Sequence, residues 1–119
     1  EALPLEGEVE SGTPGAVLGY PENGPFTISP ARAGPTAIAI SEDSYGRGPI
    51  RRSLTSLRGA VRSGNSGGPL VDGDGEVVTT VFAATTEGKP GGYGIPNDIV
   101  AAAVNESAGA GAVSTGPCA

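Results

Sequence analysis

Apolar residues are distributed along this chain in short runs, which is the pattern of β-strands rather than of long helices. Residues 26–29 alternate strictly between apolar and polar side chains, and residues 77–82 have the highest β-propensity. Turn-forming sequences separate the runs, notably Asn23-Gly24 between two prolines and residues 72–75, Asp-Gly-Asp-Gly. We predict about six strands, drawn from residues 16–20, 26–29, 36–40, 50–57, 70–71, 76–84 and 93–95. Such strands form a small antiparallel barrel or sandwich.

One helix is predicted after the last strand, over residues 96–104. Pro96 or Asn97 would begin it, and its apolar stripe would consist of Ile99, Val100, Ala103 and Val104. Residues 109–119 should form a loose tail. The fold class is therefore all-β with a C-terminal helix, in a single domain that covers residues 1–119.

Charge and composition exclude several classes of function. The chain has 119 residues and a net charge of −6, which argues against an electrostatic grip on nucleic acid or on an anionic membrane. Gly (21) and Pro (11) make up about 27% of it, a range in which disorder must be weighed, but the strand-like runs favour a folded domain. No run of about 18 apolar residues indicates a transmembrane helix.

Three residue types are informative because they are scarce. The sequence has no His, which removes the commonest general base and the commonest metal ligand. It has one Cys, Cys118, so that neither an internal disulfide nor a Cys-x-x-Cys site can form. It has no Met, so we expect it to be a piece or a processed product of a longer protein. We expect no metal and no cofactor.

The segment with the clearest chemistry is Gly64-Asn65-Ser66-Gly67-Gly68-Pro69-Leu70. Small neighbours of Ser66 let a substrate backbone come close, and glycine adopts backbone conformations that other residues avoid. A tight turn here can direct the N–H groups of Gly64 and Ser66 into one small space. Two such donors stabilise the negative oxygen of a tetrahedral acyl-transfer intermediate. Ser66 Oγ beside them would then be the nucleophile.

Other interpretations of the same residues fit less well. The surroundings of the serine do not match the nucleophile elbow of α/β-hydrolases. Pro69 and a β-strand follow Gly64-Asn65-Ser66-Gly67-Gly68, whereas an elbow is followed by a helix. A phosphate-binding loop needs a nearby Lys and a following helix, and both are missing. A glycine-rich loop without chemistry is the remaining alternative.

The heptapeptide resembles the nucleophile motif of chymotrypsin-like serine peptidases, and its asparagine is typical of their HtrA/Deg branch. Further resemblance lies in residues 3–5 and 16–21, which are similar to the opening of the second barrel, in residues 75–78 after the Asp-Gly turn, and in residues 93–100. The tail, residues 116–118, is similar to that of actinobacterial membrane-anchored periplasmic proteases. Nearly the whole chain is covered by the resemblance.

The resemblance implies a fold of two β-barrels with the active site between them. In this family the nucleophile and the oxyanion hole come from the second barrel, and the His and Asp of the triad come from the first. Because this chain has no His, the resemblance implies that it is the second, six-stranded antiparallel barrel alone and is inactive without the other. It implies a periplasmic or extracellular location, with a membrane-anchored parent protein. Cys118 would be pinned by a disulfide to the first barrel, or would be an unpaired terminal thiol.

The resemblance also assigns roles to individual residues. Ser66 would be the nucleophile, and Gly64, Asn65 and Ser66 would form the oxyanion-hole segment. In digestive members an acidic residue at the position of Asn65 pairs with a freshly cut N-terminus, so activation by that route is not expected here. Ala60 stands where trypsin-like members carry a specificity acid, which favours small or medium apolar substrate side chains. Gly92 and Tyr93 would also line the specificity pocket.

Substrate binding would involve Phe82, Ala83 and Ala84, which would pair with a peptide backbone as an added strand. Phe82 is alternatively a core residue. Three arginines, Arg51, Arg52 and Arg58, are expected to be solvated. The competing function is a non-catalytic, peptidase-like module that holds peptides by the same strand addition. The partners expected are a peptide or protein substrate, the missing first barrel, and a second copy bound through the exposed cleft face.

Overall fold

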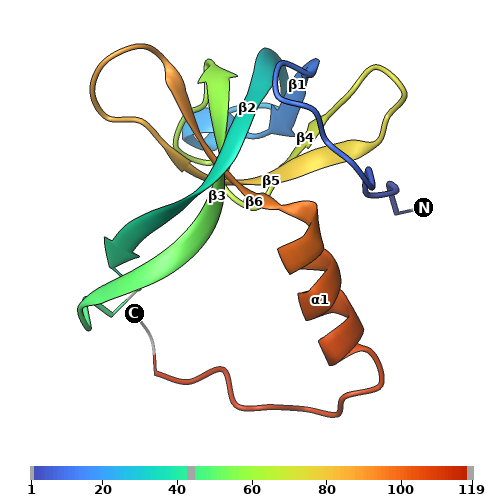
Figure 1. Cartoon of the computed structure of the whole chain (residues 1–119), viewed down its shortest axis with the longest axis vertical. Helices are drawn as coiled ribbons and strands as arrows, with labels where there is room; N and C mark the ends of the chain where they lie inside the picture. Colours follow the sequence, from blue (N-terminus) through green and yellow to red (C-terminus); the bar gives the residue numbers. More distant parts are fainter. Residues whose placement is uncertain (1, 43–44, 118–119) are drawn as a thin grey trace.

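The computed structural model describes residues 2–42 and 45–117, without the side chain of Glu42. Six strands and one α-helix follow one another along the chain (Figure 1). Their bounds are β1 Pro14–Gly19, β2 Thr27–Glu42, β3 Pro49–Gly59, β4 Pro69–Val71, β5 Val77–Ala84, β6 Gly91–Pro96 and α1 Asn97–Ser107, with a short 3-10 helix η1, Pro21–Asn23, after β1. Both predicted turns lie between paired strands.

The strands form a closed antiparallel barrel in the order β1-β2-β3-β6-β5-β4. The ring closes where Val17 of β1 lies opposite Leu70 of β4. The predicted all-β barrel with a C-terminal helix is therefore confirmed. Closure leaves no edge over most of the sheet, because each strand has a neighbour on both sides.

Strand β2 corrects the prediction of two separate strands at 26–29 and 36–40. Its first part pairs with β1, and its residues from Ala31 onward pair with β3. The backbone pairing therefore carries the strand through Pro30 and Pro35, which in the sequence looked like interruptions. The register with β3 shifts between Ala33 and Thr36, around Gly34-Pro35, so the local signal marked a bulge rather than a strand end.

The core of the barrel is aliphatic. It consists of Val17, Ala33, Leu57, Val61, Leu70, Val78 and Val81. Leu70, from the short strand β4, is 0% exposed. Large aromatic side chains, by contrast, lie at the surface, including Tyr20 and Phe26, whose rings meet edge to face at 5.7 Å.

Helix α1 packs against β5 and β6 and runs from Asn97 to Ser107, three residues beyond the predicted end. The predicted apolar stripe is wrong, because Ile99 and Val104 are exposed while Val100 and Ala101 are half-buried. Asn97 Nδ2 donates hydrogen bonds to the carbonyls of Glu6 and Val77, at 2.9 and 2.8 Å. The start of the helix is thereby tied to the entry segment and to β5.

Beyond α1, residues 108–117 lead back toward the hairpin of β2 and β3 (Figure 1). The hydroxyl of Tyr45 donates to the carbonyl of Pro117 at 2.7 Å. Cys118 and its predicted disulfide lie outside the described residues. Of the helices in the described part of the chain, none has the length and apolar character needed to cross a bilayer.

Candidate active site

The loop that carries Ser66 passes so close to the end of β1 that glycine is required at two of its positions. A Cβ on Gly64, whose φ is +96°, would lie 2.5 Å from the carbonyl oxygen of Tyr20. A Cβ on Gly68 would lie 2.6 Å from that of Leu18. Both distances are far below van der Waals contact, so these glycines let the loop lie against the backbone of β1.

Backbone hydrogen bonds fix the loop on both sides. On the side of η1, the N–H of Glu22 donates to Ser63 O at 2.6 Å. On the side of β5, Gly67 N–H donates to Val81 O at 2.7 Å, and Val81 N–H donates to Gly68 O at 2.8 Å. The residues on either side of Ser66 are therefore held by elements of the barrel.

The two predicted oxyanion donors are free. Within residues 2–42 and 45–117, the backbone N–H groups of Gly64 and Ser66 donate to no protein oxygen, while the N–H of Asn65 between them donates to Arg62 O at 3.1 Å. A free N–H in a restrained loop can bind a negatively charged oxygen without first breaking another hydrogen bond.

Asn65 is buried under β1, with 1% of its surface exposed. Its Oδ1 occupies the space that a side chain on Gly19 would need, since a Cβ there would lie 2.6 Å from this oxygen. Its Nδ2 is buried without a hydrogen-bond partner in the described part of the chain. A charged carboxylate in this place would be desolvated, so burial favours the neutral amide.

The hydroxyl of Ser66 is exposed and donates to the carbonyl of Phe82 at 3.2 Å. Among the described residues, Phe82 is a bulge residue without a partner on β6, because the register between β5 and β6 shifts between Val81 and Ala83. No histidine exists in the chain to accept the serine proton. The described site therefore holds an exposed serine hydroxyl and two N–H groups without a protein acceptor, and the chain offers no His as a general base.

One side of β5 is unpaired from Phe82 to Ala84. Strand β4 pairs with β5 only as far as Thr80, and the loop bonds to Val81 extend this contact by one residue. Beyond it, the described residues pair with β5 only from β6. Phe82 is 37% exposed and is absent from the core cluster, so its interpretation as a core residue is wrong. The exposed edge has the form required for an added peptide strand.

A cavity of about 290 Å³ adjoins the segment that leads into the loop, and Ala60 lines it. Gly91 also lines this cavity, whereas Gly92 and Tyr93 do not. Glu87 and Arg62 also border it, and the sequence analysis missed Glu87 because it lies in a loop far along the chain from the motif. The cavity is therefore not purely apolar.

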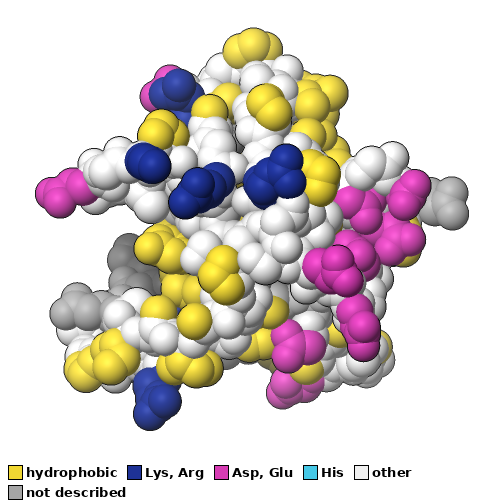
Figure 2. All heavy atoms as spheres, turned by 45° about the horizontal axis from the view of Figure 1, so that its top comes forward, with side chains coloured by type: hydrophobic (Ala, Val, Ile, Leu, Met, Phe, Trp, Pro, Cys, Tyr) yellow, Lys and Arg dark blue, Asp and Glu magenta, His cyan; other side chains and the backbone are white. Residues whose placement is uncertain are grey.

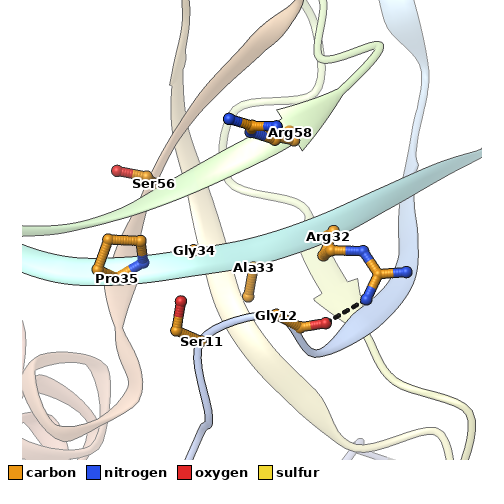
Figure 3. Close-up of a pocket in the computed structure, with 8 residues that line it drawn as sticks. All are labelled: Ser11, Gly12, Arg32, Ala33, Gly34, Pro35, Ser56 and Arg58. Carbon is orange, nitrogen blue, oxygen red and sulfur yellow. Dashed lines mark hydrogen bonds between the residues drawn. The ribbon is translucent and has the colours of Figure 1, made fainter.

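A larger cavity of about 460 Å³ lies between the entry segment and the strands β2 and β3 (Figure 3). Arg32 turns its guanidinium toward the carbonyl of Gly12, to which it donates a hydrogen bond (Figure 3). Arg58 also lines this cavity, on β3. None of the predicted site residues does.

Charged side chains of opposite sign gather on different parts of the surface (Figure 2). Of the three arginines predicted to be solvated, Arg51 and Arg58 are exposed. Arg52 is half-buried, and its guanidinium carbon lies 5.1 Å from the centroid of the Phe82 ring. The contact of Arg52 with Phe82 was not predicted, because the reach of its side chain could not be derived from its local sequence.

Comparison with known proteins identifies relatives of this arrangement, although no family model matches the chain. Serine protease Rv3671c of Mycobacterium tuberculosis strain H37Rv is 34% identical over 110 residues, which are 92% of this chain and 28% of that protein. The crystal structure of its active form matches with a TM-score of 0.87 and 34% identity, covering 98% of this chain and 52% of the solved chain. An inactive form of a serine-to-alanine mutant matches with a TM-score of 0.78 and 32% identity, covering 94% and 56%.

The HtrA-type protease AlgW, solved with a decapeptide, has a TM-score of 0.70 at 20% identity, covering 94% of this chain and 34% of AlgW, and shows the fold alone. This chain thus spans about half the length of the solved relative and a smaller share of the curated one. By sequence and by fold the chain is similar to part of this mycobacterial serine protease, and by fold alone it is similar to part of the HtrA-type proteases.

Proposed function

We propose that this chain carries the nucleophile and the oxyanion hole of a serine endopeptidase whose general base lies in another part of the protein. The observation that carries the proposal is the exposed Ser66 hydroxyl in a restrained loop, where the N–H groups of Gly64 and Ser66 are free within the described residues. The greater similarity to the active form of the mycobacterial protease than to its inactive mutant form supports the same arrangement.

In the proposed reaction, Ser66 Oγ attacks the carbonyl carbon of a peptide bond. A His and an Asp from a first barrel outside this chain would accept and orient the proton. The N–H groups of Gly64 and Ser66 would hold the oxyanion, and buried Asn65 would keep the loop in place. The intermediate would then collapse to an acyl-enzyme with release of the amine, which takes the proton from the base.

The substrate would lie along the unpaired edge of Phe82, Ala83 and Ala84 as an added strand. The side chain before the scissile bond would enter the cavity that Ala60 lines. A peptide substrate also agrees with the relatives, because AlgW was solved with a decapeptide. Without a base, a serine hydroxyl is a poor nucleophile at neutral pH, so the isolated chain should be inactive.

The proposal extends to the setting of the parent protein. We propose a periplasmic or extracellular, membrane-anchored protease, on the basis of the similarity of the tail to such proteins. The exposed aromatic pair of Tyr20 and Phe26, with exposed Ile28, offers apolar surface for the first barrel or for a second copy of the chain.

The alternative is a peptide-binding module without catalysis. The unpaired edge of β5 favours it, since binding by strand addition needs no base. Fluorophosphonate labelling separates the two functions. We expect the full-length protein to be labelled at Ser66, and neither the isolated chain nor the full-length Ser66→Ala variant to be labelled there. A folded full-length protein that resists labelling would contradict the protease and leave the peptide-binding module.

A further inference from the structure

Arg52 brings a positive charge to the residue that accepts the hydrogen bond of the proposed nucleophile. Its guanidinium lies over the ring of Phe82, with 5.1 Å between Cζ and the ring centroid. The carbonyl of the same phenylalanine lies 3.2 Å from Ser66 Oγ. Arg52 is thus separated from the reacting atom by a single residue.

The side chain of Arg52 is held in this position. Its Nε donates to the Oγ of Ser41 at 2.9 Å, and the ring of Phe82 packs against its planar face. A guanidinium held at two points loses less conformational entropy on binding a ligand than a free surface arginine does. The stem is half-buried, while the ring beneath it is 37% exposed, so the contact lies at the surface of the proposed cleft.

No carboxylate of the described chain neutralises this guanidinium. The ion pair found within the described residues joins Arg62 and Glu22, 4.0 Å apart on the surface. Arg52 uses one nitrogen for Ser41, so its other N–H groups remain available, and a guanidinium has five such donors in a fixed plane. In a chain of net charge −6, this leaves a cation at the rim of the proposed site.

We propose that Arg52 gives the protein a preference for substrates with a carboxylate side chain at the second residue on the N-terminal side of the scissile bond. This inference rests on the proposed function. A carboxylate is the group that matches the free donors of a guanidinium, to which it binds in bidentate geometry.

The position follows from the alternation of side chains in an added strand. The residue before the scissile bond would direct its side chain into the cavity that Ala60 lines, and neither Phe82 nor Arg52 lines that cavity. Successive side chains of a strand point to opposite faces. The second side chain therefore points away from the cavity, and we infer that it points to the face of the added strand on which Phe82 and Arg52 lie.

The preference should be modest and sensitive to salt. An ion pair at a solvent-exposed rim contributes up to about 1 kcal/mol. This free energy corresponds to a ratio of roughly five between the rates for a substrate with a carboxylate and a matched substrate without one. Because the charges are close to solvent, the ratio should fall as the ionic strength rises and the Debye length shortens.

The test uses two peptidyl diphenyl phosphonates with the full-length protein. Both end in the valine phosphonate, which reacts with a serine Oγ to form a P–O bond with loss of phenoxide. They differ only at the residue before it, Glu in one and Gln in the other. We expect the Glu probe to label Ser66 about five times faster, and this ratio to fall to about one in Arg52→Gln. Arg52→Lys should retain part of the preference.

Arg58→Gln is the matched control, because Arg58 lies on the same strand, is exposed, and borders a different cavity. This variant should keep the wild-type ratio. Equal rates for the two probes in the wild type, with labelling at Ser66, would overturn the inference and leave the proposed function intact. A loss of rate with both probes in Arg52→Gln, at an unchanged ratio of the two rates, would also overturn the inference. Arg52 would then only support the structure of the site. If neither probe labels Ser66, the proposed function and the inference both fail.

Discussion

Replacement of Gly64 by alanine should impair the proposed oxyanion hole by displacing the loop that carries it. The new Cβ would lie 2.5 Å from the backbone oxygen of Tyr20, whereas ordinary contacts begin near 3.4 Å. The loop would have to move by roughly 0.9 Å, and displacements of about this size can lower a rate about 100-fold. Loss of one oxyanion donor costs a similar or larger factor. We therefore expect the rate constant for fluorophosphonate labelling of the full-length protein to fall at least about 100-fold.

Gly67 offers a control within the same loop. Its φ is +85°, so alanine would be strained there too, at a cost of about 1–3 kcal/mol. No atom, however, lies within 4 Å of a Cβ at this position. Gly67→Ala should therefore lower the melting temperature while labelling stays within a few-fold of the wild type. Wild-type labelling by Gly64→Ala, or an equal loss in both variants, would refute the assignment of the clash to the oxyanion hole.

Three further substitutions test the packing and the charges of the barrel. Leu70→Ala should destabilise the chain by about 2–5 kcal/mol in urea unfolding, because Leu70 is 0% exposed, and Leu3→Ala, at an exposed position, should have little effect. Gly94→Ala would place a Cβ 2.3 Å from the Oγ1 of buried Thr79, and a loss of about 1–3 kcal/mol is expected by the same measurement. Burial of the carboxyl and neighbouring carboxylates raise the pKa of Glu6 above 4.5, so the folded state binds this proton more tightly than the unfolded state. The resulting stabilisation is complete below pH 4.5 and is lost as the pH rises through the pKa of the folded state. Glu6→Gln should therefore raise the melting temperature at pH 7 and raise it much less at pH 4. Equal shifts of the melting temperature at pH 7 and pH 4 would contradict the assignment.

The loop around Ser66 could be predicted from sequence because its constraints are local. Gly64 and Gly68 are required by backbone contacts that any chain in this turn would make, and the sequence displays these glycines directly beside the serine. The hairpin at residues 72–75 follows from turn chemistry in the same way. Such features are encoded within a few residues, where sequence patterns are most informative.

The features that the sequence did not reveal depend on pairing between distant segments. Pro30 and Pro35 look like strand breaks, but the ladders to β1 and β3 hold the backbone extended on both sides of them. The contact of Arg52 with Phe82 joins residues 30 positions apart on two strands that are both neighbours of β6. Glu87 reaches the cavity of Ala60 only because β5 and β6 bring their connecting loop beside it. No local propensity encodes these contacts.

The unsatisfied groups of the site share a physical explanation. Two backbone donors, an exposed hydroxyl bonded to a carbonyl at 3.2 Å, a free strand edge and an orphaned buried amide on Asn65 all lie in or next to one loop. In a self-sufficient domain such groups are normally paired, because an unpaired buried amide costs about 1–3 kcal/mol. Buried side-chain atoms without a partner in the described part of the chain also occur at Glu6 and Asn97, so such an atom does not by itself mark the site. The exposed donors, the hydroxyl and the free strand edge form a surface that other groups can complete. If a first barrel and a peptide complete it, the exposed amides at Gly64 and Ser66 should gain protection from hydrogen exchange in the full-length protein bound to a phosphonate peptide, and the core amides of β4 and β5 should change little.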